Sequence, residues 1–129
     1  MEISIPVSPG ELLDKISILE IKRERIADPA KRANVARELA LLQGVRGHAL
    51  PTSESLEALY GQLKAVNEAL WEVEDRLRDC ERRRDFSADF VADARAVYRS
   101  NDRRAALKRE INALLGSELV EEKSYASYE

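Results

Sequence analysis

Three polar side chains fall where the apolar face of a long helix should continue. From Phe90 onward, apolar residues recur at helical spacing, and the same stripe extended at about 3.6 residues per turn reaches Asn101, Lys108 and Asn112. A buried amide is costly unless it is hydrogen-bonded, and a buried ammonium needs an anionic partner. The stripe therefore indicates either an organised polar site in a helical bundle or a helix that breaks near Ser100.

Polar residues intrude in the same way on the apolar faces of two earlier helical segments. If they converge, they form a site for a phosphorylated small molecule such as a sugar nucleotide or nucleotide. The candidate ligand-binding residues are Glu20, Arg23, Asn67, Trp71, Glu74, Asn101, Arg104, Lys108 and Asn112. An antiparallel hairpin would bring Asn67, Asn101 and Arg104 together. Glu20 is the candidate carboxylate partner of Lys108, and no catalytic residue is assigned.

Two alternatives compete with a ligand site. In the first, a new helix begins at Asn101, because Asn is a favoured N-cap residue and Asp102 suits the first turn. Lys108 and Asn112 would then face water. In the second, the helix is continuous and its polar residues form a purely structural network. The sequence leaves all three alternatives open.

The pattern Glu-x-x-Asp occurs twice, at Glu11–Asp14 and at Glu72–Asp75. Residues three apart share a helix face, so either pair could bind a divalent cation through carboxylate oxygens. All-α nucleotide pyrophosphohydrolases hold magnesium with paired acidic motifs of this general kind. However, Glu11 is also explained by a helix cap, and Glu72 and Asp75 lie where a solvated face is expected. We therefore expect no cofactor, and Mg²⁺ belongs only with the small-molecule alternative.

Basic residues cluster at 82–84 and again between Arg99 and Arg109. Acidic residues interleave with them, and no ladder of stacking aromatics or recognisable nucleic-acid module is present. The whole chain carries 21 Lys and Arg against 24 Asp and Glu, for a formal charge of −3. We expect a solvated, salt-bridged surface and no nucleic-acid partner, although Arg also suits bidentate contacts to one phosphate group.

Length and composition indicate one all-α domain. The 129 residues are 44% hydrophobic and only 5% aromatic, with Leu-, Ala-, Glu- and Arg-rich segments. Cys80 is the only cysteine, which excludes an intrachain disulfide and fits a reducing compartment. No signal-peptide pattern and no apolar stretch long enough for a membrane span is found. These features predict a cytoplasmic protein.

Cap signals place the first two helices. Ser8 and Glu11 form a capping-box pattern around Pro9, so the first helix is expected from Pro9 to about Ala27. An Asp-Pro pair at 28–29 begins the second helix, which is predicted to end before Gly44. Residues 44–52 are rich in Gly and Pro and are expected to form a loop.

The third helix, residues 53–84, carries an apolar seam that alternates steps of three and four residues without interruption. The seam positions are Leu56, Leu59, Leu63, Val66, Leu70, Val73, Leu77 and Cys80. This spacing predicts coiled-coil-like packing and makes Cys80 a core residue. With a last helix over 88–115, it predicts four main helices with a long antiparallel hairpin. Residues 1–8 form an extended arm and residues 117–129 a tail.

The first helix is apolar on two sides. Leu12, Ile16 and Leu19 share a broad face, while Ile18 and Ile21 lie on the opposite one. A helix of this kind is typically central or lies at a subunit interface. We therefore expect a homodimer in which a second subunit covers Ile18 and Ile21.

Four segments of the chain resemble a family of small, uncharacterised, all-α bacterial proteins, a domain of unknown function. They are PGELLDKISILEIK at 9–22, LWEVED at 70–75, YRSNDRRAALKREIN at 98–112 and EEKSY at 121–125. The resemblance implies no established activity, but it implies an association with glycosyltransferase and surface-polysaccharide functions. We expect a non-enzymatic binding or scaffold module for a protein partner in that metabolism. The alternative is an enzyme or binder for a phosphorylated small molecule.

Overall fold

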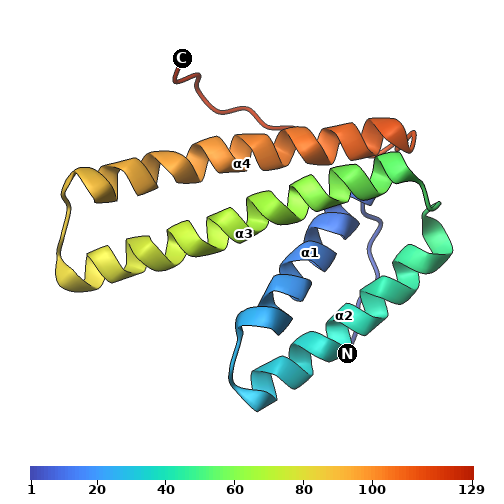
Figure 1. The fold of residues 1–129 in the computed structure, drawn as a ribbon. Coiled ribbons are helices and arrows are strands. Elements are labelled where there is room, and N and C mark those ends of the chain that lie inside the picture. The colour runs from blue at the N-terminus through green and yellow to red at the C-terminus, as the bar shows by residue number, and fades with distance from the viewer.

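The chain folds into four α-helices and contains no strand, as predicted for an all-α protein. In the computed structural model, which describes residues 1–129, the helices are α1 (Pro9–Arg25), α2 (Pro29–Ala49), α3 (Glu54–Arg83) and α4 (Ala88–Leu114). The last two form the expected long antiparallel hairpin, and the first two pack near one end of it (Figure 1). No helix combines the length and apolarity that a membrane crossing requires.

The helix starts follow the capping signals of the sequence. Ser8 Oγ accepts a hydrogen bond from the Glu11 N–H at 3.2 Å, and Asp28 Oδ2 accepts one from the Lys31 N–H at 2.9 Å. In both helices a proline follows the cap, where a missing N–H costs nothing. Ser53 caps α3 in the same way. The Ser8 cap fixes where α1 begins, and this start sets where the polar residues of its first two turns lie.

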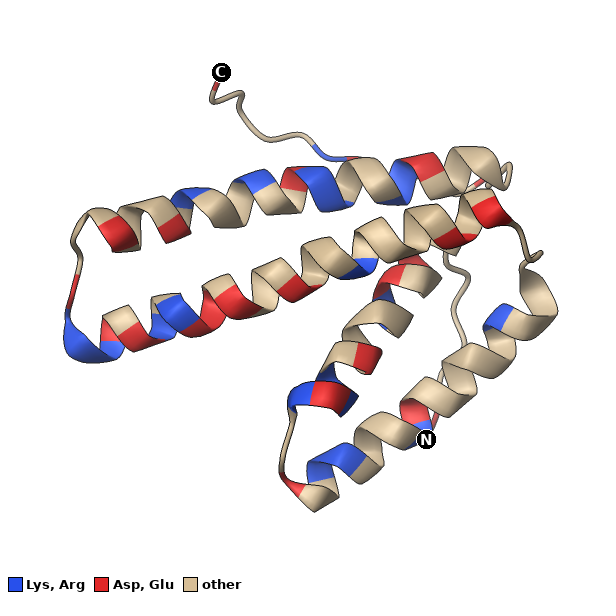
Figure 2. Ribbon diagram, in the orientation of Figure 1, with Lys and Arg blue, Asp and Glu red and all other residues tan.

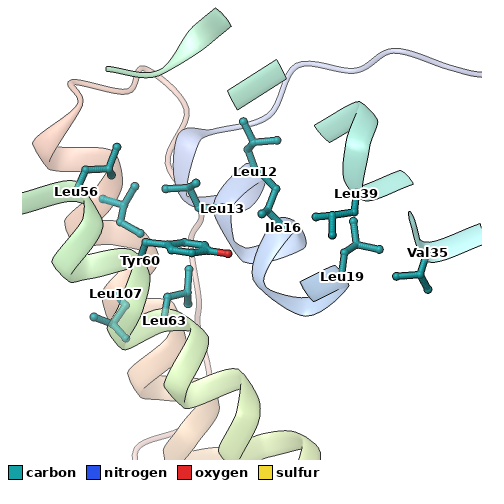
Figure 3. Close-up of a cluster of buried hydrophobic side chains, with 11 residues drawn as sticks. Leu12, Leu13, Ile16, Leu19, Val35, Leu39, Leu56, Tyr60, Leu63 and Leu107 are labelled. Atoms are coloured by element: carbon teal, nitrogen blue, oxygen red, sulfur yellow. The ribbon is translucent and has the colours of Figure 1, made fainter. Parts of the chain in front are cut away.

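The hydrophobic core lies where α1 meets the other three helices. Figure 3 shows the α1 side chains Leu12, Leu13, Ile16 and Leu19 between Val35 and Leu39 of α2 and the α3 residues Leu56, Tyr60 and Leu63. Leu107 and Ile111 of α4 complete the cluster and are fully buried. Each enclosed aliphatic side chain contributes about 1.5–3 kcal/mol. The core therefore anchors α1 on the C-terminal part of α4.

The seam predicted for α3 faces inward along its whole length. Each of its positions from Leu56 to Cys80 is buried or half-buried, and Cys80 is a core residue as expected. Toward the hairpin turn only α3 and α4 remain, because α1 and α2 lie at the other end (Figure 1). There Phe86 and Val91 are more than half exposed.

The prediction that the second helix ends before Gly44 is wrong, and residues 44–49 are helical instead of a loop. Helix α2 continues through Gly44 and Gly47 to Ala49. Interior glycines cost a helix about 1 kcal/mol each relative to Ala. Leu42 and Leu50 pack against the core on either side of them. Tertiary packing therefore outweighs the low helix propensity of the glycines.

The restart of a helix at Asn101 is excluded, because α4 runs without a break through Ser100 and Asn101. Ile21 also differs from expectation. It is 1% exposed within a single chain, since α1 is packed between α2 and the α3–α4 hairpin. Ile21 therefore needs no second subunit for cover, and the sequence-based reason for a homodimer fails at this residue.

Candidate functional site

A second face of α1 gathers the polar groups that α4 carries in its apolar stripe. Gly10, Asp14, Ser17 and Ile21 follow one another at steps of four, three and four residues, so they share one side of the helix. All four are buried. Three of them bind polar side chains of the α3–α4 hairpin. This face of α1 therefore packs on the hairpin, while the Leu-rich face forms the core.

Asp14 is the centre of the polar cluster. Its Oδ1 accepts hydrogen bonds from Asn67 Nδ2 at 2.9 Å and from Arg104 Nε at 2.8 Å. Arg104 Nη2 binds the other carboxylate oxygen, so the guanidinium engages both. Lys108 Nζ lies 3.8 Å from Oδ2. Asn67 Nδ2 also donates to Ser17 Oγ at 2.8 Å. Of the three residues predicted to meet, Asn67 and Arg104 thus do so on a carboxylate, whereas the Asn101 side chain makes no hydrogen bond to either.

The surroundings of Asp14 keep it ionised. Burial alone would raise the pKa of its carboxyl group, because a charge is disfavoured away from water. Hydrogen bonds from Arg104 and Asn67, together with the charges of Arg104 and Lys108, outweigh burial and lower the pKa below its ordinary value. The hydrogen bond to Asp14 raises the pKa of Arg104. The buried pair is therefore fully charged at neutral pH.

Lys108 is held by two carboxylates. Its Nζ lies 2.7 Å from Glu11 Oε2 and 2.7 Å from Glu121 Oε2, and only 5% of its side chain is exposed. Burial would lower its pKa, but the hydrogen bonds to Glu11 and Glu121 and the charge of Asp14 outweigh burial and raise it. The prediction that Glu20 is the carboxylate partner of Lys108 is wrong. Helix α1 presents Glu11 from its first turn instead.

Gly10 allows the start of α1 to lie directly against α4. Its N–H donates to Asn112 Oδ1 at 2.7 Å. A Cβ on Gly10 would lie 2.6 Å from the Lys108 carbonyl oxygen and 2.9 Å from Asn112 Oδ1, so only glycine fits without a shift. The first N–H groups of a helix have no partner within the helix. Asn112 therefore caps α1 from α4, and its buried Nδ2 has no partner of its own.

Glu20 belongs to a separate network further along α1. Tyr60 Oη donates to its Oε1, and Lys64 Nζ lies 3.0 Å from its Oε2 and 2.9 Å from Glu24 Oε1. Burial and the hydrogen bond to Glu20 raise the pKa of Tyr60. The Arg46 guanidinium lies 4.7 Å from the centre of the Tyr60 ring. This network joins α1, α2 and α3 and does not include Lys108.

Four other candidates lie outside the Asp14 cluster. Asn101 is half-buried and lines a cleft between α4 and the C-terminal tail. Arg23 is exposed, and Trp71 is half-buried without a hydrogen bond to the cluster. Glu74 binds Arg78 one turn later on α3. Helix α1 makes its side-chain hydrogen bonds to α3 at positions from Tyr60 to Glu72. Glu74 therefore lies beyond the reach of α1.

The two Glu-x-x-Asp pairs have different surroundings. Glu11 and Asp14 are both engaged by Lys108, which explains their shared face without a metal. Glu72 is exposed and lies 3.3 Å from Arg25, and Asp75 is also exposed. The structure contains no group of three or more His, Cys, Asp or Glu side chains placed to hold a metal ion.

Asp14, Ser17 and Glu121 complete the cluster, although the sequence pattern did not single them out as its members. The available signal was the spacing from Asp14 to Ser17 and Ile21, because polar residues in register with a buried Ile share its face. No comparable signal exists for Glu121. It lies in a segment without periodicity, and only the path of the chain brings it to Lys108.

The tail, residues 117–129, runs back along α4. Its side-chain contacts are, in order, Glu121–Lys108, Lys123–Asp102 and Tyr128–Tyr98. The tail is therefore antiparallel to the helix, and an open cleft of about 1400 Å³ lies between them. We call it the α4 groove, and its helix side is lined by Tyr98, Asn101, Asp102, Arg104, Lys108 and Arg109. Figure 2 shows the Lys and Arg bands of α4 over this stretch.

The chain belongs to a family of unknown function, DUF6165, whose model matches residues 2–128. The match confirms the family resemblance of the four sequence segments and covers the Asp14 cluster and most of the tail. No curated protein and no solved structure matches the chain.

Proposed function

We propose that this member of DUF6165 is a non-enzymatic helical binding module. The supporting observation is that each buried ionisable group of the Asp14 cluster is held in its ordinary charged state by an opposite charge. General acid–base catalysis favours the reverse, a carboxyl pKa raised or a lysine pKa lowered toward neutral pH. Here the pKa of Asp14 is lowered and that of Lys108 is raised. The cluster fits a role in joining α1 to the hairpin.

The charge count of the cluster favours a carboxylate ligand over a phosphate. Glu11, Asp14 and Glu121 carry three negative charges against two positive charges on Arg104 and Lys108, for a sum of −1. A phosphate dianion in place of Glu121 would bring the sum to −2 in a partly buried site. Like charges repel strongly where water is excluded. A single carboxylate leaves the sum unchanged.

A thermal-shift panel tests the proposal. The protein is mixed with sugar nucleotides, nucleoside triphosphates and sugar phosphates at millimolar concentration, with and without Mg²⁺. A binding module for proteins should show no saturable rise in melting temperature, because a ligand stabilises only the fold it binds. Saturable stabilisation by any of these compounds would overturn the proposal.

The second candidate function is binding or turnover of a phosphorylated small molecule, which the panel tests with and without Mg²⁺. The observation in its favour is the α4 groove, which is lined by Arg104, Lys108 and Arg109 and, further along the helix, by Tyr98. Arginine suits bidentate contacts to phosphate, and an aromatic ring suits a nucleobase. In the same panel this function requires a saturable shift, which Arg109→Ala should weaken without lowering the stability of the free protein.

For the biological context, we propose a protein partner in bacterial surface-polysaccharide metabolism. The support is the family resemblance of the four sequence segments. Deletion of the gene should change the amount or the chain-length profile of surface polysaccharide in the parent bacterium. An unchanged polysaccharide in the deletion strain would contradict this assignment.

We also propose a homodimer, formed through the outer half of the α3–α4 hairpin instead of through α1. Along this half Leu70, Leu77 and Phe90 are only half-buried, and Val91 is 51% exposed. A second hairpin would complete a four-helix arrangement around them. Sedimentation should show a dimer that Val91→Asp converts to a monomer. A wild-type monomer at high micromolar concentration would contradict the proposal.

A further inference from the structure

We propose that the α4 groove binds an extended peptide of a partner protein that carries a carboxylate for Lys108. The chain's own tail occupies the groove until such a peptide replaces it. This inference rests on the proposed function as a binding module and names the kind of partner. The tail is itself the evidence that the groove accepts a peptide, because it lies there through three pairs of side chains.

The tail is held loosely enough to be exchanged. No backbone hydrogen bond joins residues 118–129 to the helices, and the last one is donated by Ser117 to the Asn112 carbonyl. The apolar side chains of the tail bury little surface, since Leu119, Val120 and Tyr125 are 46%, 55% and 83% exposed. Segments with few buried contacts and no backbone ladder open at a small free-energy cost.

Lys108 makes an empty groove unfavourable. Its side chain is 5% exposed, and its ammonium group has two close carboxylates, from Glu11 and Glu121. When the tail leaves, one of these acceptors is lost. The 5% exposure of Lys108 holds with the tail in place, so departure of the tail opens its ammonium group to the cleft with one charge-assisted hydrogen bond fewer. An occupant that returns a carboxylate to Lys108 is therefore favoured over an empty groove.

The three contacts also define the order of groups in the peptide. A carboxylate must reach Lys108, a cation two positions later must reach Asp102, and an aromatic ring five positions further must reach Tyr98. In the tail, Glu121, Lys123 and Tyr128 supply these groups. A partner segment with the same order along an extended chain would make the same contacts.

The experiment measures competition between the tail and a peptide in trans. A dye-labelled peptide of residues 117–129 is titrated with the full-length chain, and binding is followed by fluorescence anisotropy. The attached tail has a high effective concentration, so the wild-type chain should bind the peptide weakly. The variant Glu121→Gln weakens the contact between the tail and Lys108 and leaves the α4 side of the groove unchanged. It should bind the wild-type peptide about fivefold more tightly, the effect of about 1 kcal/mol on a dissociation constant.

Glu122→Gln is the matched control. Glu122 is adjacent in the tail and makes no ion pair, so this chain should bind the peptide as the wild type does. A peptide with Gln at position 121 should bind all chains more weakly. No binding to any chain at millimolar concentration would overturn the inference, and so would equal binding to the Glu121→Gln and Glu122→Gln chains. The small-molecule panel is independent of this result, so failure here is distinguishable from failure of the proposed function.

Discussion

Arg104 and Asp14 lie 90 positions apart in the chain and form a two-pronged ion pair that joins α4 to α1. The carboxylate is 2% exposed, whereas 31% of the arginine side chain reaches water. The pair is therefore asymmetric. If it breaks, the guanidinium can turn to solvent, but the carboxylate remains buried with Asn67 and Lys108 as its remaining partners. The position of α1 on the hairpin depends on this contact.

Gly10→Ala should destabilise the protein. Alanine is the better helix former, but its Cβ would meet the Lys108 carbonyl at 2.6 Å, and backbone atoms must shift to make room. We expect a loss of about 1–3 kcal/mol in the free energy of unfolding, measured by urea denaturation. Gly61→Ala in α3 is the control, since nothing lies within 4 Å of the added Cβ. It should stabilise by about 0.5–1 kcal/mol. A stabilising Gly10→Ala would show that α1 does not approach α4 so closely.

Lys108→Met should cost about 2–4 kcal/mol in stability, because it leaves the buried Asp14 and the partly buried Glu11 short of one cation. Arg109→Met provides a neighbouring control. Arg109 is exposed and forms no ion pair, so its replacement should change stability by less than about 0.5 kcal/mol. Equal effects of the two substitutions in chemical denaturation would mean that Lys108 is solvated.

The charged groups of the Asp14 cluster predict that the free energy of unfolding stays nearly constant over a broad pH range. The pKa of Asp14 is lowered by folding, so its contribution is present above the ordinary value of 3.8 and is lost as pH falls through the lower folded pKa. The pKa of Lys108 is raised, so its contribution is complete below 10.5 and is lost as pH rises through the higher folded pKa. The urea midpoint of unfolding is measured across this pH range. As pH falls into the acid region, the midpoint of Asp14→Asn should decrease less steeply than that of the wild type. Identical acid slopes would exclude Asp14 as a source of the dependence.

Gly44→Ala and Gly47→Ala should each stabilise the protein by about 0.5–1 kcal/mol. Both glycines lie inside α2, and an added Cβ at either position would meet nothing within 4 Å. Circular dichroism should show unchanged helix content with a raised melting temperature. A neutral or destabilising effect at both positions would indicate that residues 44–49 form a loop, as the sequence pattern suggested.

Sequence patterns predicted the helices well because caps and apolar periodicity are local signals. The caps at Ser8 and Asp28 and the seam from Leu56 to Cys80 depend on neighbouring residues, and the structure confirms them. The end of α2 was misplaced because packing of Leu50 outweighs the low helix propensity of Gly44. That preference arises from tertiary contacts, which local patterns do not contain.

The candidate site was predicted in part. The polar stripe of α4 correctly marked Lys108 and Asn112 as residues with buried partners, and the antiparallel hairpin did the same for Arg104. The partner of Lys108 on α1 was misassigned to Glu20, because helix spacing gives the face on which a residue lies but not the point along the axis at which two helices meet. Glu121 was beyond prediction, since the path of the tail depends on contacts among residues distant in the chain.

A double-mutant cycle on Asp14→Leu and Arg104→Leu tests the central claim most directly, that the polar stripe is a buried ionic network joining α1 to α4. Arg104→Leu leaves the buried Asp14 carboxylate without its main partner and should cost about 3 kcal/mol or more. Asp14→Leu leaves a guanidinium that can turn to solvent and should cost less, and the double variant removes both charges. We predict that the double variant loses at least about 2 kcal/mol less than the sum of the two single losses in urea denaturation. Losses that add to within about 0.5 kcal/mol would contradict the claim, because they would mean that the two side chains do not interact.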